Sequence, residues 1–555
     1  MHAPAMKLRT SLALCAFLAA CGGGGGGSAT IAGSGNAGTV AFNSAPVSTA
    51  TLTVDAAQAV SDTGGDDVAA ARALFRGASY PESNFGLESS ANLLNGIGTT
   101  YSRTINAEDS SYVDGTGAFF PANRIMWSLE WIKRYGYNAH VIVGQRQPAF
   151  IAVPASQWAP EHWAAYQDYA TKFVRYVAVQ YDNTGFQETL FEVGNEVDIT
   201  QDVRDLWTVA NPAVPQGAEE RYQHYLKVFQ VWSRAVEQVA QENPARVIRI
   251  AGPAMGGQSL FLTGQFWHER FIADVTAGGW RLDVLTHHFY GDVLNGWANV
   301  PGSSLRAQLQ RMRRALVARG LPALPIAITE YGPSEGNDAV FGHINYSHEG
   351  AAWAATFIHE ALSGTATAGS YLIVRDNFGG NLTGVPTVAS LDHIRDGVDY
   401  PKAVYNAFRM YTLLPGTRKA VTQSSVQSDV RGFASADGSS AALIAYNYNF
   451  RFNWPSDYTD LTYTQAVVPA FTRLGFDGDV TVDRYLIDQS TSNLAYYLDN
   501  GMTPDYNGSM LTRVETCAAK VSAGGLVLPA RVMRPSAVSL WIVRSANTAG
   551  LAACQ

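Results

Sequence analysis

Two short strings of the sequence decide the predicted fold: FEVGNE at residues 191–196 and IAITEYG at residues 326–332. Each is an apolar, strand-like run that carries a glutamate near its end, Glu196 in the first and Glu330 in the second. Around them, apolar runs of strand length alternate with segments whose apolar residues recur at helical spacing. Parallel strands joined by helices predict an α/β fold, and the number of repeats favours a closed (β/α)8 barrel, the TIM barrel.

We expect this barrel over residues 67–416. Its first two strands are ambiguous, because residues 73–77 and 84–88 compete for them. After residue 417, short strand-like runs are separated by Gly, Asp, Asn and Ser turns, which predicts an all-β sandwich over residues 417–555. The alternating pattern that begins at residue 51 predicts a strand, within 51–66, that joins this sandwich.

The N-terminus has the pattern of a secretory signal over residues 1–21. Two basic residues precede an apolar stretch, and small residues lead up to Cys21. The string LAAC resembles the lipobox of bacterial lipoproteins, which implies that Cys21 is lipidated and that residues 22–50, rich in Gly and Ser, form a tether. The alternative is an ordinary signal peptide with a chance cysteine. We expect a lipid-anchored protein of the bacterial cell envelope, at the outer membrane.

Length and composition exclude some classes of function. A chain of 555 residues predicts two or three domains, and its net charge of −8 argues against a nucleic-acid partner. Besides Cys21 and Cys15 of the signal, the chain has only Cys517 and Cys554, which can form one disulfide in an oxidising compartment. No paired Cys/His spacing accompanies them, so a zinc site is not expected.

Glu196 and Glu330 indicate the chemistry. Carboxylates at the C-terminal ends of separate barrel strands meet at one face, and two such groups are what glycosidic cleavage requires. Glu196 is the candidate acid/base, with the neighbouring Asn195 able to bond a sugar hydroxyl, and Glu330 is the candidate nucleophile. The structural alternative is a strand-end glutamate paired with Arg or Lys. Carboxyl chemistry of this kind needs no cofactor.

The string DVLTHHFY at residues 283–290 lies between the two glutamates. Strand alternation places His288 and Tyr290 on one face and His287 on the other. If the first face is the site, Tyr290 can donate a hydrogen bond to Glu330 and keep it ionised. The alternatives are core packing or a metal site, and no further metal ligands in register are evident.

Together these strings resemble clan A of the glycoside hydrolases, over about residues 70–412. The resemblance implies a (β/α)8 barrel with the acid/base after an asparagine on the fourth strand, the nucleophile on the seventh, and a His-x-Tyr on the sixth. Families 39, 51, 30 and 79 of that clan append a β-sandwich partly built from the segment before the barrel. The family 39 pattern is the one we favour.

The chain departs from these relatives at two places. The second-strand arginine that they often carry has its nearest counterpart in Arg76, which is therefore a tentative site residue. The eighth strand ends in YLIVRDN (371–377) instead of a tryptophan. Arg375 in that string could contact an acidic sugar, although a surface Arg–Asp pair is the simpler explanation.

The prediction from sequence is a retaining glycoside hydrolase acting on a polysaccharide or oligosaccharide by double displacement. Its membrane contact would be the lipid anchor alone, and we favour a monomer. One alternative is a non-catalytic polysaccharide-binding lipoprotein, which would have no need of two convergent carboxylates. Another is a transglycosylase that uses the same residues.

Overall fold

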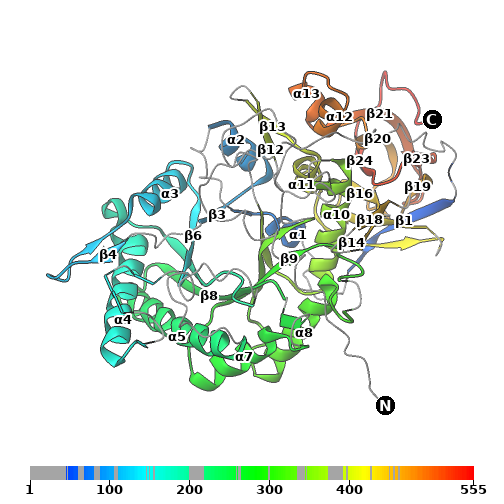
Figure 1. The fold of residues 1–555 in the computed structure, drawn as a ribbon. Coiled ribbons are helices and arrows are strands. Elements are labelled where there is room, and N and C mark those ends of the chain that lie inside the picture. Colours follow the sequence, from blue (N-terminus) through cyan, green and yellow to red (C-terminus); the bar gives the residue numbers. More distant parts are fainter. Residues whose placement is uncertain are drawn as a thin grey trace, which may run out of the picture.

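The computed structural model describes one chain with a barrel and an all-β domain side by side (Figure 1). Residues 1–45, which include Cys21, lie outside the part that it describes. The described residues are 46, 48–60, 68–79, 88–104, 111–145, 147–148, 150–153, 157–198, 218–257, 259–260, 264–297, 300–333, 344–345, 347–372, 392–395, 398–425, 428–448, 450–453, 457–460 and 463–555.

Eight parallel strands close into a barrel in the order β10-β11-β2-β3-β6-β7-β8-β9. This confirms the predicted fold class. The strand that carries FEVGNE is the fourth of the barrel and the strand that carries IAITEYG is the seventh. The bounds are β2 Gly77–Ser79, β3 Tyr101–Thr104, β6 Asn138–Val143, β7 Glu188–Val193, β8 Val247–Met255, β9 Val284–Tyr290, β10 Ile326–Gly332 and β11 Ala368–Tyr371.

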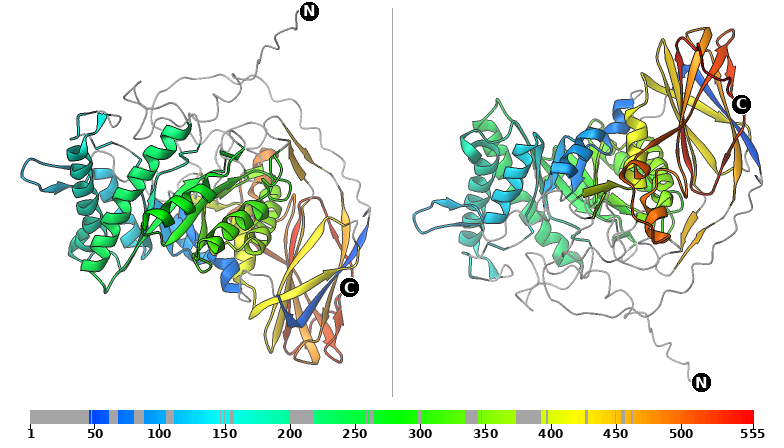
Figure 2. Two further views of the ribbon diagram at one scale, coloured as in Figure 1. Left: turned by 90° about the horizontal axis from the view of Figure 1, so that it is seen from below. Right: turned by 90° about the horizontal axis from the view of Figure 1, so that it is seen from above.

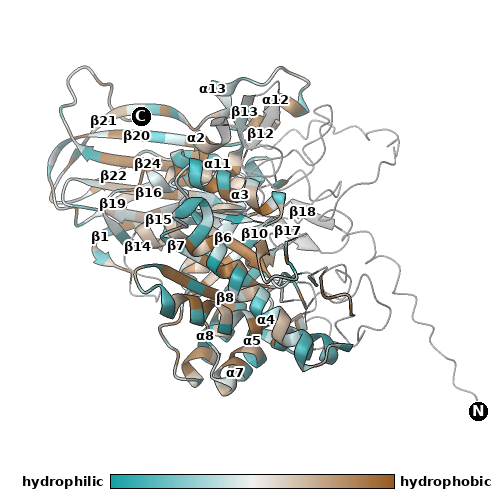
Figure 3. Cartoon of the chain, turned by 90° about the vertical axis from the view of Figure 1, so that its left-hand side faces the viewer, coloured by the Kyte–Doolittle hydropathy of each residue, from teal (hydrophilic) through white to brown (hydrophobic). Residues whose placement is uncertain are grey.

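Helices surround the barrel, and most of those labelled in Figure 3 have both hydrophilic and hydrophobic residues along their length, which is typical of helices that pack one face against the strands. Helix α10 is buried along almost its whole length, because it lies between the barrel and the all-β domain. The helices are α1 Val68–Ala73, α2 Glu88–Ile97, α3 Asn123–Arg134, α4 Pro160–Arg175, α5 Ala218–Glu242, α7 Trp267–Gly278, α8 Leu305–Ala318, α10 His348–Ser363 and α11 Ala403–Thr412. Two hairpins, β4 Tyr112–Val113 with β5 Phe119–Phe120 and β12 Asp392–Arg395 with β13 Val398–Pro401, lie in the connections.

The first two barrel strands differ from both segments that competed for them. β2 begins at Gly77, where the first segment ends, and β3 lies at Tyr101–Thr104. Of the second segment, Glu88 begins α2 and the rest lies outside the described residues. β3 was missed because its four residues, YSRT, include no aliphatic run, yet three of them are buried inside the barrel.

The all-β domain is one ten-stranded sheet that curls so that its two ends cover a shared apolar core (Figure 2). Strand β1 (Thr49–Ala59) lies between β14 and β19, antiparallel to the first and parallel to the second. The other strands are β14 Thr417–Gln423, β15 Val430–Ala436, β16 Ser440–Asn447, β19 Gln465–Thr472, β20 Gly478–Ile487, β21 Thr512–Val521, β22 Leu526–Val527, β23 Arg531–Met533 and β24 Val538–Ser545; β17 Phe450–Asn453 and β18 Asp457–Asp460 form a separate hairpin.

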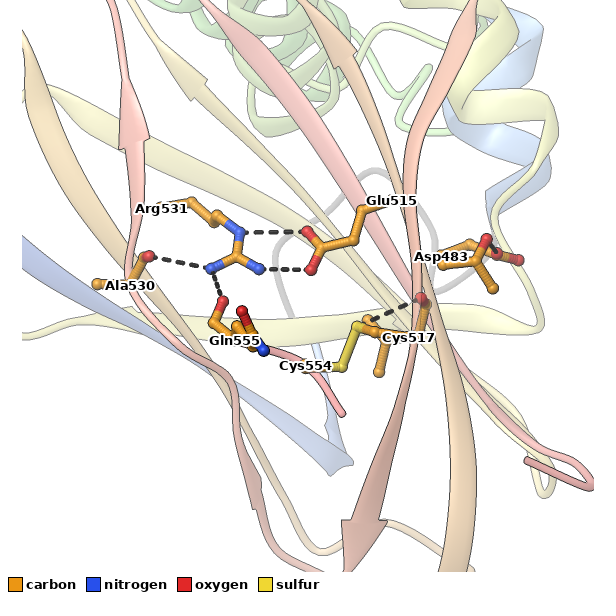
Figure 4. The surroundings of a disulfide bond; sticks show 9 residues. Asp483, Glu515, Cys517, Ala530, Arg531, Cys554 and Gln555 are labelled. Carbon is orange, nitrogen blue, oxygen red and sulfur yellow. Dashed lines mark hydrogen bonds and ion pairs between the residues drawn. A yellow bond between two sulfur atoms is a disulfide. The ribbon is translucent and has the colours of Figure 1, made fainter. Parts of the chain in front are cut away.

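A disulfide joins Cys517 on β21 to Cys554, the residue before the C-terminus (Figure 4). Beside it, Arg531 on β23 forms an ion pair with Glu515 on β21 and donates a hydrogen bond to the carbonyl oxygen of Gln555. The last residues of the chain are therefore attached to the sheet by one covalent bond and by the guanidinium of Arg531.

The outer face of the curled sheet covers α10 and α11 with apolar side chains, among them Ile444 and Ile542. Glu360 of α10 is buried and forms ion pairs with Arg306 of α8 and with Arg431 of β15. The barrel and the sheet therefore share one continuous hydrophobic core with a charged group at its edge. Among the described residues, no helix is long and apolar enough to cross a membrane.

Candidate active site

Glu196 and Glu330 converge at the C-terminal end of the barrel. Glu330 lies on β10, and Glu196 follows the end of β7 by three residues. One carboxylate oxygen of each, with one ring nitrogen of His288, lies within 4.8 Å of the other two atoms. Both glutamates are buried, at 8% and 5% exposure. An oxygen–oxygen distance of at most 4.8 Å is compatible with the carboxyl separation of about 5–5.5 Å that is typical of retaining glycosidases, and it is shorter than the roughly 6.5–9.5 Å of inverting ones.

The backbone that presents Glu196 is held in an unusual conformation. Glu196 has a φ of 51°, in the left-handed region that costs a residue with a side chain about 1–3 kcal/mol. Gly194 has a φ of 81°, and a Cβ there would lie 2.9 Å from the ring of Tyr225. The amide of Glu196 donates to the carbonyl oxygen of Ala254 on β8. The turn after β7 is therefore fixed by its neighbours, and it places the carboxylate of Glu196 beside His288.

Arg103 on β3 links three other side chains of the site. Its guanidinium is fully buried and donates to Glu330 at 2.7 Å, to Glu192 at 2.6 Å and to Asn195 at 3.0 Å. A planar guanidinium can serve several acceptors in fixed directions, which a lysine cannot. Arg103 therefore places the amide of Asn195 and the carboxylate of Glu330 relative to each other.

The structure does not bring Arg76 to this cluster. Arg76 is exposed and precedes β2, and its carbonyl oxygen accepts from the amides of Thr100 and Tyr101 where β3 begins. It therefore lies at the N-terminal end of the barrel, opposite the two glutamates. The second-strand arginine is Arg103, which sequence reasoning missed together with the strand that carries it. Arg375 lies outside the described residues.

Glu192 is a third carboxylate of the site, and it too was missed. It lies inside the barrel with no exposed surface and accepts from Arg103, from Nε2 of His140 at 3.1 Å and from the hydroxyl of Thr329. Burial alone would raise the pKa of Glu192, but the charge of Arg103 and the hydrogen bond from His140 hold it well below its usual value. Glu192 is thus ionised, and Arg103 is shared between two carboxylates.

Glu330 is also held in its ionised form. Burial raises its pKa, but His288, the charge of Arg103 and the hydroxyl of Tyr290 together bring that pKa below its usual value. Tyr290 donates to Oε1 of Glu330 at 2.6 Å, while Arg103 donates to Oε2. Both oxygens therefore have a donor, and the carboxylate has one fixed orientation.

His288 connects the two catalytic candidates, and its tautomer follows from its neighbours. Arg103 can only donate, so Nε2 of His288, 3.2 Å from the guanidinium, is the acceptor and Nδ1 carries the proton. Nδ1 then donates to Oε1 of Glu196 at 2.9 Å. Burial lowers the pKa of His288, which keeps the ring neutral. His287 points the other way, with Nδ1 near the carbonyl oxygen of Met255, as strand alternation predicts.

Glu196, His288 and Glu330 are close enough to be considered as metal ligands. The donor set does not fit that role. Nδ1 of His288 carries a proton in the tautomer that Arg103 imposes, and Oε2 of Glu330 already faces the guanidinium, whose positive charge would repel a cation. The arrangement fits acid/base and nucleophilic chemistry better than metal binding.

No family model matches the chain, and no curated protein is similar enough in sequence to count as a match. Solved structures are similar in fold. A GH39 enzyme from Xanthomonas axonopodis pv. citri has a TM-score of 0.67 at 17% identity, with 90% of this chain and 98% of that chain covered. A monomeric β-xylosidase from Caulobacter crescentus CB15 has a TM-score of 0.65 at 18% identity, with 89% and 99% covered.

A bacterial orthologue of human α-L-iduronidase is also similar, with a TM-score of 0.63 at 13% identity over 91% of this chain and 85% of that one. Identities this low establish the fold and not the activity. The likeness nevertheless extends over the barrel and the appended sheet together. The resemblance to clan A glycoside hydrolases of the family 39 type is thus confirmed at the level of the whole fold.

Proposed function

We propose that this protein is a retaining glycoside hydrolase in which Glu330 is the nucleophile and Glu196 the acid/base. The observation that carries the proposal is the convergence of two buried carboxylates, of which Glu330 is held in its ionised form. Glu330 receives donors on both oxygens, from Arg103 and Tyr290, which suits a group that must be ionised. Glu196, the other carboxylate, accepts a hydrogen bond from the neutral ring of His288 at Oε1, and we assign it the proton that passes to the leaving group.

In the first step, Glu330 attacks the anomeric carbon of the bound sugar. The bond from that carbon to the leaving oxygen breaks, the leaving oxygen takes the proton of Glu196, and a glycosyl ester forms on Glu330. Arg103 and Tyr290 stay bonded to the carboxyl group throughout and keep it oriented. Asn195, fixed by Arg103, is placed to bond a hydroxyl of the same sugar.

In the second step, Glu196 removes a proton from water, and the water oxygen bonds to the anomeric carbon. The ester bond breaks and Glu330 is released as a carboxylate. Two displacements at one carbon retain its configuration. A non-catalytic binding protein would have no use for a buried carboxylate with two donors beside a second carboxylate, so the geometry favours the enzyme.

The substrate class is carbohydrate, a polysaccharide or oligosaccharide. The similar structures are described as a β-xylosidase, a glucosidase and an α-L-iduronidase orthologue, and a xyloglucanase is also among them. These names define the first sugars to test: xylosides, glucosides, iduronides, xylan and xyloglucan.

We also propose that the chain is exported and lipid-anchored through Cys21 at the outer membrane. The support is the sequence alone, a basic and apolar leader followed by LAAC and a glycine run. Labelling of expressing cells with an alkyne-tagged palmitate should mark the wild-type protein and not Cys21→Ser. Equal labelling of both would contradict the anchor and leave the enzyme proposal untouched.

The enzyme proposal is tested with a panel of 4-nitrophenyl glycosides and polysaccharides, with products followed by mass spectrometry and by NMR of the anomeric proton. We expect turnover with retained configuration. A 2-deoxy-2-fluoro glycosyl fluoride of the preferred sugar should label Glu330, as read by peptide mapping. An inverted product, or a label on another residue, would contradict the assignment, and products longer than the substrate would identify a transglycosylase.

A further inference from the structure

The end of the curled sheet that faces the barrel reaches the level of the catalytic face. Tyr448, just after β16, is buried and donates to Oδ1 of Asp292 at 3.4 Å. Asp292 lies two residues beyond Tyr290, whose hydroxyl is bonded to Glu330. The sheet therefore touches the loop that follows the sixth barrel strand.

Residues 488–511, which connect β20 to β21, leave the sheet at this same end. The strand order is β20-β24-β16, and Val538 of β24 pairs with Ile487 on one side and with Tyr446 on the other. With neighbouring strands about 4.8 Å apart, Ile487 and Tyr446 are roughly 10 Å from each other. The connection therefore starts level with Tyr448, close to the catalytic face. We call residues 488–511 the insertion.

The insertion is attached firmly to the barrel. Asn406, in the first turn of α11, is fully buried and donates to the carbonyl oxygens of Ser492 at 2.9 Å and Ser509 at 2.6 Å. In a barrel the helices run back from the catalytic face, so the first turn of α11 is at that face. The two short helices of the insertion, α12 Leu494–Asp499 and α13 Tyr506–Ser509, lie beside the β12–β13 hairpin in both views (Figures 1 and 3).

This region is rich in tyrosines that keep part of their surface open. Tyr506 of α13 is 38% exposed, and its ring lies 5.9 Å from that of Tyr400 on β13 in an edge-to-face arrangement. Tyr496 and Tyr497 of α12 are half-buried neighbours, with ring centroids 5.6 Å apart. We call these four residues the tyrosine shelf. The exposed Asn500 and Asn507 are close to these tyrosines in sequence, and the amide nitrogen of Asn500 donates to the carbonyl oxygen of Tyr496. Amides next to aromatic rings add hydrogen bonds to the stacking that a sugar needs.

We propose that the tyrosine shelf binds the part of a glycan chain that extends beyond the cleaved bond. The natural substrate is then a polysaccharide or a long oligosaccharide, not a simple glycoside. This inference rests on the proposed function, since it continues the same substrate from the barrel onto the insertion. Its occupant is a carbohydrate, because the shelf belongs to the insertion, which starts level with the catalytic face, and because it combines aromatic rings with amides.

If the tyrosine shelf had a purely structural role, its rings would serve only to pack the two domains together. Asn406 and the apolar face on α11 already supply that attachment. Tyr506, in contrast, retains more than a third of its surface in solvent, although it sits in the contact with Tyr400. A residue needed only for cohesion would be covered.

The test compares two substrates in one set of variants. The probes are the polysaccharide of the panel that the wild-type enzyme cleaves fastest, and the 4-nitrophenyl glycoside of the sugar that it releases. In Tyr506→Ala, the ratio of kcat/KM for the polysaccharide to kcat/KM for the glycoside should fall about three- to tenfold, the effect of losing one stacked ring. Tyr506→Phe, which keeps the ring, should hold the wild-type ratio.

Tyr112→Ala is the matched control, because Tyr112 is 42% exposed and lies on the β4–β5 hairpin, across the barrel from the insertion (Figure 1). It should leave the ratio unchanged. Tyr400→Ala provides a second shelf variant if Tyr506→Ala lowers the melting temperature. If the ratio of the two kcat/KM values is unchanged in both Tyr506→Ala and Tyr400→Ala, the tyrosine shelf does not bind the glycan.

Affinity gel electrophoresis in the same polysaccharide provides a readout without turnover. Glu330→Gln should be retarded more than Glu330→Gln combined with Tyr506→Ala, and equal retardation would count against the shelf. If the wild-type enzyme cleaves the glycoside but no polysaccharide or oligosaccharide, the shelf fails and the proposed function stands. If it cleaves neither probe, the proposed function itself fails.

Discussion

Two buried regions of this molecule are held together by opposite means. At the catalytic end of the barrel, three carboxylates, one guanidinium and two imidazoles are buried side by side, and the charged groups are paired. Inside the curled sheet the core is apolar, with side chains such as Leu52, Leu443 and Trp541, and a disulfide at its edge.

The difference shows which changes should affect chemistry and which should affect stability. Removing one partner of a buried ion pair leaves an uncompensated charge, at a cost of about 3–5 kcal/mol, and it also changes the protonation of the neighbours. Removing a covalent link in the sheet changes the unfolding equilibrium and leaves the site as it is. The effect on catalysis should therefore decrease from the buried carboxylates of the barrel to the disulfide of the sheet.

Glu330→Gln should give the largest effect. The amide is the same size but cannot form the glycosyl ester, so kcat should fall by a factor on the order of 10⁴–10⁶. Thermal unfolding followed by circular dichroism should show a folded protein. Glu188→Gln is the matched control, because Glu188 lies on barrel strand β7 at the opposite end and pairs with Arg249 near the surface. Near wild-type turnover in Glu330→Gln would remove Glu330 from the mechanism.

Glu196→Gln should show an effect that depends on the leaving group. Without a proton donor, glycosides of poor leaving groups should lose about 10²–10⁴-fold in kcat/KM, while a 2,4-dinitrophenyl glycoside, whose leaving group needs no proton, should lose far less. Added azide should restore turnover, because this anion attacks the glycosyl ester without a general base. The same loss for both leaving groups, with no azide effect, would exclude Glu196 as the acid/base.

Glu192→Gln should shift the pH dependence. Glu192 is ionised, and removing its negative charge makes the other carboxyl groups that face Arg103 and His288 stronger acids. Both limbs of the kcat/KM profile should therefore move to lower pH, by about one unit for a charge at this distance. If Glu192 served only to fill space, the profile would keep its position and only its height would change. Glu188→Gln again serves as the control.

The strands and residues of the barrel show which parts of the fold and of the site could be predicted from the sequence. From β6 onward the apolar periodicity predicted most of the barrel strands, and Val284–Tyr290 has the predicted bounds, because these strands are buried on both sides and read as apolar runs. The positions of Glu196, Glu330 and Tyr290 followed from strand ends. β2 and β3 did not, since three or four residues with small or polar side chains carry no periodic signal.

Arg103 and Glu192 were missed for a related reason: a charge in a short or apolar strand is interpretable only when its partner across the barrel is known. Glu192 was visible within FEVGNE, where a carboxylate inside an otherwise apolar strand signals a buried cation nearby. Arg103 is this cation, and it lies 89 residues earlier in the chain, on β3. The place of β1 between β14 and β19 is another such long-range pairing.

Opening the disulfide should have the smallest effect on catalysis. Cys517 and Cys554 are 37 residues apart in sequence, and closing a loop of that length restricts the unfolded chain by an amount worth about 2–4 kcal/mol. Cys554→Ser should therefore unfold at lower denaturant concentration, and a reducing agent should do the same to the wild-type protein. The bond joins β21 to the end of the chain and is far from the tie of Tyr448 to Asp292, so kcat/KM for a simple glycoside should stay within twofold of wild type. A parallel loss of activity in the folded variant would show that the two regions are coupled, against the separation that their contrasting interiors imply.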